Sequence, residues 1–413
     1  MKGVLFTFMI VLIALTLVSL IGIQKTLTSY YREKMIIGTR VKSMNNFYDD
    51  IIIDSSKALD IITKESVVIA ISRIVTSGEP LEDAVSVLEE LILDGTFNGT
   101  SEVLMENSTF QSWIERMEGL GILKGFNTNI EFQNLEIQQY DSWNLLASID
   151  IHINISDKQT SASLKRNISL NQLVSVEGFE DPIFPLNTFG RATSIIKKSP
   201  YWGNFTQKLI TSSGSLGWFA GISVVFPSSE QGSIQNVPDK DTKVLVIDDT
   251  TGIEALANSF GGLVTESNAT GILVPFVHNA ANAMSLLPNN TYILVDGNNG
   301  NVWNIENLNY SVENSYYYPS KKGATFLERL EGNLESVYQT GIGLETFVDK
   351  SYLINLEVPV STGKTNVDHL FFSPGLHSGN AVKGLANNFR IDDELCTGDL
   401  PHSEIYNVSE ILI

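Results

Sequence analysis

An uninterrupted apolar segment, VLFTFMIVLIALTLVSLIGI, runs from Val4 to Ile23 and contains no charged residue. As a helix that rises about 1.5 Å per residue, a segment of this length covers the ~30 Å hydrocarbon layer of a bilayer. Its hydroxyl side chains are Thr7, Thr16 and Ser19, which a helix can satisfy with its own carbonyl groups. No later segment of the sequence is comparably long and apolar. We therefore expect one membrane-spanning helix and a single-pass topology.

A cleaved secretory signal peptide is the main alternative, with Lys2 as a minimal basic region in front of the apolar segment. The segment is longer than the ~7 to 15 apolar residues of such peptides, and no small-residue cleavage site precedes a polar mature start. We therefore interpret residues 1–24 as a retained membrane anchor.

The charges beside the anchor and the glycosylation motifs point to opposite sides of the membrane. Basic residues follow the anchor at Lys25, Arg32, Lys34, Arg40 and Lys42, so the positive-inside rule alone places the body in the cytoplasm. Asn-x-Ser/Thr motifs, which are glycosylation sites in exported proteins, favour an extracytoplasmic body. They lie at Asn98, Asn107, Asn154, Asn167, Asn204, Asn268, Asn289, Asn309 and Asn407. We expect the body outside the cytoplasm.

The composition limits the class of partner. The formal net charge of −20 argues against a nucleic-acid partner, because phosphates require a basic surface. With 43% hydrophobic residues the chain is not disordered, and its length after the anchor allows two domains. Cys396 is the only cysteine, so no intrachain disulfide forms.

The first part of the body, residues 25–190, is predicted to contain a long helix and an antiparallel sheet. Apolar residues continue at helical spacing after the anchor, which predicts a helix. Their seven-residue recurrence is short and includes Lys34 and Ser55, so a helix packed on a sheet is favoured over a coiled coil. Short helices are expected over LEDAVSVLEELIL, opened by Pro80, and over FQSWIERMEGLG, capped by Ser108 or Thr109. Alternating isoleucines from Ile149 onward then predict an antiparallel hairpin with one buried face.

The second part of the body is predicted to be a mixed α/β domain over residues 241–413. A Gly- and Ser-rich boundary region, 191–240, precedes it. Strands are expected at VLVI, TYILVDG, YLINLEVPV and VDHLFF, and helices at IEALANSF and GATFLERLEGNLE. The expected fold class is α+β: a long transmembrane and amphipathic helix on an antiparallel sheet, followed by this domain.

The start of the chain resembles the type IV pilin-like proteins, which include archaeal pilins and secretion pseudopilins. The resemblance rests on Lys2-Gly3 directly before an apolar helix that continues as an amphipathic one, and on the hairpin that follows. It implies that a membrane peptidase cuts between Gly3 and Val4 on the cytoplasmic face and that the helix holds the body outside. The implied partners are the membrane and other pilin-like or envelope proteins, with oligomers allowed.

Two features depart from the assembling major pilins. Phe8 stands where those proteins usually carry a glutamate, so the ion pair between neighbouring subunits is missing. The chain is also several times longer than their usual head. Both departures favour a minor pilin, a pseudopilin or a surface protein that stays in the membrane.

Two groups of residues are candidates for metal binding. Asp248 and Asp249 follow the predicted strand VLVI and could hold Mg²⁺ or Ca²⁺, although a cap of the following helix is the plainer interpretation. His369, His377 and His402 lie in one C-terminal stretch with Asp368, Asp392, Asp393 and Glu394. Because their spacing fits no metal-ligand pattern, we expect scattered surface histidines.

These observations favour a non-enzymatic protein without a cofactor, acting through protein contacts in a cell-surface filament, a secretion apparatus or the envelope. The alternative is a membrane-tethered, extracytoplasmic, metal-dependent hydrolase that uses Asp248 and Asp249 or the C-terminal histidines.

Overall fold

The computed structural model describes residues 2–201, 205–208, 301–337, 341–382, 384–385, 388–392 and 400–413, together with short strands between 224 and 296. The chain divides into two compact units. Unit 1 contains Met1–Ala70, Asp83–Tyr140 and Asn144–Ser175, and unit 2 contains Ile71–Glu82, Asp141–Trp143 and Val176–Ile413.

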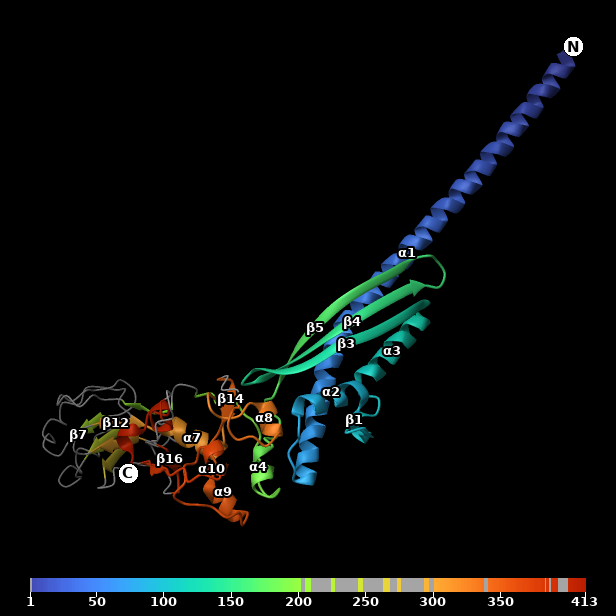
Figure 1. The fold of residues 1–413 in the computed structure, drawn as a ribbon. Coiled ribbons are helices and arrows are strands. Elements are labelled where there is room, and N and C mark those ends of the chain that lie inside the picture. The colour runs from blue at the N-terminus through green and yellow to red at the C-terminus, as the bar shows by residue number, and fades with distance from the viewer. Residues whose placement is uncertain are drawn as a thin grey trace. The chain divides into compact units, whose positions relative to one another are not determined.

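Unit 1 is built on one continuous helix, α1, which spans Lys2–Ser77 and belongs to this unit up to Ala70 (Figure 1). Every side chain from Phe6 to Thr39 is exposed or nearly so, and the first buried one is Met44. The N-terminal half therefore extends beyond the rest of unit 1. Its surface is apolar from Phe6 to Ile23, and charged residues follow from Lys25 onward. Among the described residues, α1 is the one helix long and apolar enough to cross a membrane, which confirms the predicted apolar helix.

Two hydroxyl side chains of the apolar segment, those of Thr16 and Ser19, are satisfied within α1. The hydroxyl of Thr16 donates to the carbonyl of Ile13 at 2.8 Å, and that of Ser19 donates to the carbonyl of Leu15 at 2.8 Å. In hydrocarbon an unpaired hydroxyl would cost free energy, so these bonds make the segment compatible with lipid.

A three-stranded antiparallel sheet forms the second layer of unit 1, in the order β3-β4-β5. The strands are β3 (Phe126–Asp141), β4 (Asn144–Asp157) and β5 (Ser163–Ser175). Alternate β4 side chains are buried, as expected for a sheet with one covered face. The buried apolar residues are Leu145, Ala147, Ile149, Ile151, Ile153 and Ile155. The predicted hairpin is confirmed, and β3 extends it to a third strand.

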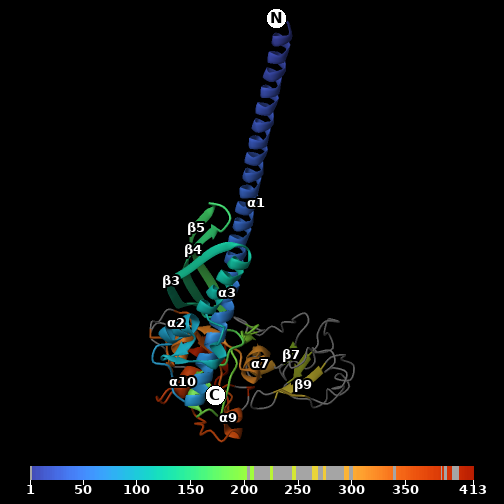
Figure 2. The same ribbon diagram turned by 90° about the vertical axis from the view of Figure 1, so that its right-hand side faces the viewer.

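The C-terminal half of α1 lies along this sheet (Figures 1 and 2). Phe47 stacks on Phe126 with ring centroids 5.8 Å apart. The Arg40 guanidinium donates to the buried Asp157 carboxylate at the end of β4, with Nε at 2.8 Å. These contacts confirm a helix packed on a sheet, as predicted.

Two shorter helices complete unit 1 (Figure 1). α3 (Phe110–Leu123) is capped by Thr109, whose hydroxyl accepts from the Ser112 amide. α2 (Ala84–Asp94) begins after Asp83, not at Pro80, because the Asp83 carboxylate accepts from the amide of Ser86. Between them lie β1 (Thr96–Phe97), β2 (Thr100–Ser101) and the 3₁₀ helix η1 (Val103–Met105).

Unit 2 consists of short helices and strands. One sheet has the order β10-β9-β8-β7, in which β7, β8 and β9 run parallel, and another has the order β11-β12-β6. These strands are β6 (Gln207–Lys208), β7 (Val224–Phe226), β8 (Val244–Ile247), β9 (Leu263–Ser267), β10 (Leu273–Pro275), β11 (Ile293–Asp296) and β12 (Asn301–Asn304). The predicted strand VLVI is β8, and the predicted strand TYILVDG contains β11. The predicted helix IEALANSF lies outside the described residues.

The remaining elements of unit 2 are short. The helices are α4 (Ile183–Asn187), α7 (Glu306–Asn314), α8 (Phe326–Leu330), α9 (Lys350–Asn355), α10 (Asp368–Phe372), α11 (His402–Ile405) and the 3₁₀ helix η3 (Ser409–Ile411). The strands are β13 (Tyr318–Ser320), β14 (Gly343–Glu345), β15 (Asn380–Ala381) and β16 (Arg390–Ile391).

Two predicted strands of unit 2 are wrong. YLINLEVPV begins inside α9, because the Asp349 carboxylate accepts from the amides of Ser351 and Tyr352 and so starts a helix. VDHLFF contains α10. Short apolar segments of this length do not distinguish a strand from a buried helical turn. The helix predicted over 323–335 is present only as α8, which has a capping box formed by Thr325 and Glu328.

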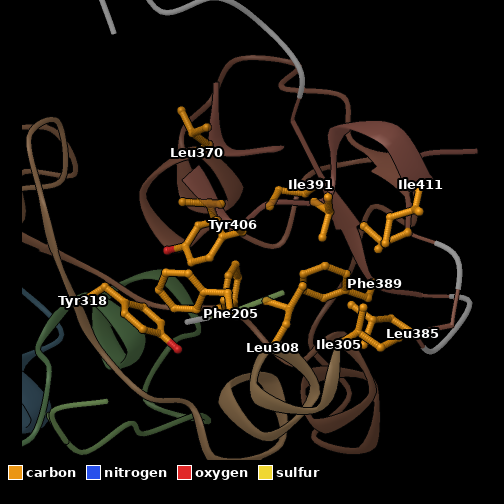
Figure 3. Packing of buried hydrophobic residues seen from close by; sticks show 14 residues of the cluster. Phe205, Ile305, Leu308, Tyr318, Leu370, Leu385, Phe389, Ile391, Tyr406 and Ile411 are labelled. Atoms are coloured by element: carbon orange, nitrogen blue, oxygen red, sulfur yellow. The ribbon is translucent and has the colours of Figure 1, made fainter. Parts of the chain in front are cut away.

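An aromatic and aliphatic cluster forms the core of unit 2 (Figure 3). The ring centroid of Tyr406 lies 4.5 Å from that of Phe205 and 5.6 Å from that of Tyr318. Tyr406 is 1% exposed, so its ring is fixed by packing. Its hydroxyl points out of this cluster into the polar site described next.

Candidate metal centre

Three buried side chains from separate segments of unit 2 converge at one point. Glu345 ends β14, His369 lies in α10 and His402 begins α11. Each is at most 4% exposed. We call these three residues the Glu-His-His cluster. Their potential ligand atoms all lie within 4.8 Å of one another.

The distances within the cluster are short. Nε2 of His402 lies 3.3 Å from Oε2 of Glu345, and Nε2 of His369 lies 3.8 Å from the same oxygen. The two imidazole rings are 5.7 Å apart between centroids. One carboxylate oxygen and two imidazole nitrogens therefore face a common point.

Neighbouring polar groups hold two of the three side chains in place. Nδ1 of His402 is 2.8 Å from the carboxylate of Asp392. The hydroxyl of Tyr406 donates to Oε1 of Glu345 at 2.6 Å. Both contacts leave Nε2 of His402 and Oε2 of Glu345 directed toward the centre of the cluster.

The charges of Glu345 and His402 support each other. Burial alone would lower the pKa of His402, but the charge of Glu345 and the hydrogen bond with Asp392 raise it to about 10. Burial likewise opposes ionisation of Glu345, yet the charge of His402 and the contacts with both histidines keep its pKa well below the usual value.

A second buried charged group lies beside the cluster in sequence and space. Arg329 is fully buried, and its Nη1 donates to Asp181 at 2.5 Å and to Asp368 at 2.9 Å. Its Nη2 donates to the carbonyl of Leu344, the residue before Glu345. We call Arg329, Asp181 and Asp368 the Arg329 triad. Burial raises the pKa of Asp368, and the charges of Asp181 and Glu345 add to this despite Arg329.

The expectation of scattered surface histidines is wrong for His369 and His402, which the fold brings together in the interior. His377 is only half-buried and is not part of the cluster. Asp392 contacts His402, and Asp368 belongs to the Arg329 triad. Asp393 and Glu394 lie outside the described residues.

The other sequence candidates are distributed as follows. Asp248 and Asp249 lie outside the described residues, as do Asn204, Asn268 and Asn289. Asn98, Asn107, Asn167 and Asn407 are exposed, and Asn154 and Asn309 are half-buried. Lys2, Gly3 and Val4 form the start of α1.

Glu345, Tyr406 and Arg329 were not recognised from the sequence as site residues. Glu345 lies far from both histidines along the chain, in a stretch without a motif. Arg329 was predicted only as part of a helix. No local signal distinguishes either residue from a surface charge, since the placement depends on the packing of unit 2.

No protein-family model, curated protein or solved structure matches this chain. Two features of the chain bear on its function: the exposed apolar segment of α1 in unit 1 and the Glu-His-His cluster in unit 2.

Proposed function

We propose that the chain is a single-pass membrane protein of pilin-like build that acts through protein contacts outside the cytoplasm. One observation carries the proposal: α1 is continuous, with an exposed apolar segment that ends at Ile23 and a second half that packs on an antiparallel sheet. An apolar helical surface of this length is stable in lipid and not in water. Lys2-Gly3 directly before the apolar segment supports the pilin-like interpretation.

The proposed role is that of a minor pilin, a pseudopilin or a related surface protein in a filament, secretion apparatus or envelope. Phe8 lacks the carboxylate that would pair with a neighbouring subunit in lipid, so a repeating filament core is disfavoured. Unit 2, proposed as a mixed α/β domain, would be the displayed part. The exposed sequons, for example Asn98 and Asn407, suit a glycosylated exterior.

A membrane-tethered, metal-dependent hydrolase is the second candidate, and the Glu-His-His cluster favours it. A catalytic metal keeps an open position for water and substrate. The three side chains of the cluster are at most 4% exposed, which suits a structural site better than one that admits a substrate. We therefore place the non-enzymatic role first.

Orientation can be tested by labelling engineered cysteines on intact cells. In a Cys396→Ser background, Leu123→Cys places a thiol on a side chain that is 84% exposed in unit 1. We expect a membrane-impermeant maleimide to label it before lysis. Ile51→Cys, at a position that is 0% exposed in the same unit, is the matched control and should stay unlabelled.

Labelling of Leu123→Cys only after lysis would place the body in the cytoplasm. That outcome would agree with the basic residues that follow the anchor, and it would contradict the proposed function.

A further inference from the structure

We propose that Glu345, His369 and His402 bind one divalent transition-metal ion of the zinc class, and that this ion ties together three segments of unit 2. The ligands come from β14, α10 and α11, which are distant along the chain. This site is independent of the proposed membrane role.

The spacing of the ligand atoms fits such an ion. Zinc binds imidazole nitrogen and carboxylate oxygen at ~2.0–2.2 Å, so neighbouring ligand atoms of a tetrahedral site lie roughly 3.3–3.6 Å apart. The two distances from Oε2 of Glu345, 3.3 Å to His402 and 3.8 Å to His369, lie close to this range. Small side-chain rotations would be enough to bind the ion.

His369 provides the second, independent observation. Its side chain is fully buried, yet neither Nδ1 nor Nε2 has a hydrogen-bond partner. A buried polar atom left without a partner costs free energy, and native proteins rarely keep one without a reason. Nε2 of His369 faces Oε2 of Glu345 at 3.8 Å, a distance too long for a hydrogen bond but suited to two ligands of one ion.

The groups around the cluster are those that orient metal ligands in proteins. A histidine ligand commonly donates its second ring N–H to a carboxylate, and a carboxylate ligand is itself hydrogen-bonded. Asp392 is the carboxylate that contacts Nδ1 of His402. The hydroxyl of Tyr406 is the donor that holds Oε1 of Glu345. Packing in the core of unit 2 fixes the ring of Tyr406 (Figure 3).

The local charge also favours a cation. Four buried carboxylates lie in or beside the site, at Asp181, Glu345, Asp368 and Asp392. The Arg329 guanidinium neutralises part of this negative charge. A divalent cation would neutralise more of it.

The metal content of the full-length protein in detergent tests the site. After removal of metal with a chelator and dialysis against Zn²⁺, we expect about one ion per chain by elemental mass spectrometry. His369→Ala should lose that ion. His377→Ala, which removes a half-buried histidine of the same unit, should retain it.

Asp392→Asn keeps all three ligands and changes only the group that orients His402. We expect it to weaken Zn²⁺ binding about 10- to 100-fold, as is usual when such a neighbour is altered. Equal affinity in Asp392→Asn and wild type would overturn the assigned orientation of His402.

X-ray absorption at the zinc edge of the wild-type protein requires no variant and therefore avoids any folding defect. We expect nitrogen and oxygen ligands, with the signature of two imidazoles and no sulfur. Three results would each overturn the site: no stoichiometric ion in the wild type, a spectrum without imidazole, or an unchanged ion content in His369→Ala.

Discussion

Replacing Leu12 and Leu15 together by arginine should release the protein from the membrane. Both side chains lie near the middle of the apolar half of α1 and are exposed, by 52% and 64%. An arginine at the centre of a membrane helix costs about 2.5–3.5 kcal/mol on insertion scales, so the pair costs roughly 5–7 kcal/mol. We expect most of the protein to leave the membrane pellet during an alkaline carbonate wash.

The matched control is Ile53→Arg with Ile61→Arg on the same helix. These isoleucines are 58% and 54% exposed but lie in the half of α1 that packs on the sheet. Their substitution should leave the protein in the pellet. Equal release of both double variants would show that membrane retention does not depend on the N-terminal segment.

Removal of the Arg329 charge should strongly destabilise unit 2. Arg329→Met leaves Asp181 and Asp368 buried without their cation, and breaking a buried ion pair in this way costs about 3–5 kcal/mol. Hydrogen exchange measured on peptides of unit 2 reports the free energy of opening. We expect the free energy of opening of unit 2 to fall by about 3–5 kcal/mol. The peptides of unit 1, followed in the same experiment, provide the internal comparison.

Two further variants separate charge from volume. Arg191→Met removes an exposed arginine of unit 2 that donates to a backbone carbonyl, and it should have little effect. Adding Asp181→Asn and Asp368→Asn to Arg329→Met removes the unpaired charges and should recover part of the loss. A loss below ~1 kcal/mol in Arg329→Met would contradict the structural role of the triad.

The elements that were predicted correctly from the sequence are those in which a hydrophobic repeat extends over many residues. The apolar segment from Val4 to Ile23 and the helical spacing after it predicted α1. The alternation from Ile149 to Ile155 predicted the hairpin, because period-two burial extends over several residues. Thr109 was predicted as a cap from its place before an apolar helix.

The parts that the sequence did not predict depend on tertiary packing. α9 and α10 are too short to show a hydrophobic period. The Asp349 cap favours a helical turn at α9, and burial of four of its five residues favours one at α10. The Glu-His-His cluster joins Glu345, His369 and His402 from separate segments. The sequence therefore contains no metal-ligand motif with a characteristic spacing. Both histidines of the cluster were placed in one candidate group because they lie in the same C-terminal stretch. Their burial was not predicted.

The mass of the mature N-terminus tests the central proposal most directly. Intact-protein and peptide mass spectrometry of the protein isolated from its native membrane should show a chain that begins at Val4, after loss of Met1, Lys2 and Gly3. That result would support the pilin-like interpretation of α1. A chain that retains Met1, or one cut at any position other than after Gly3, would contradict it.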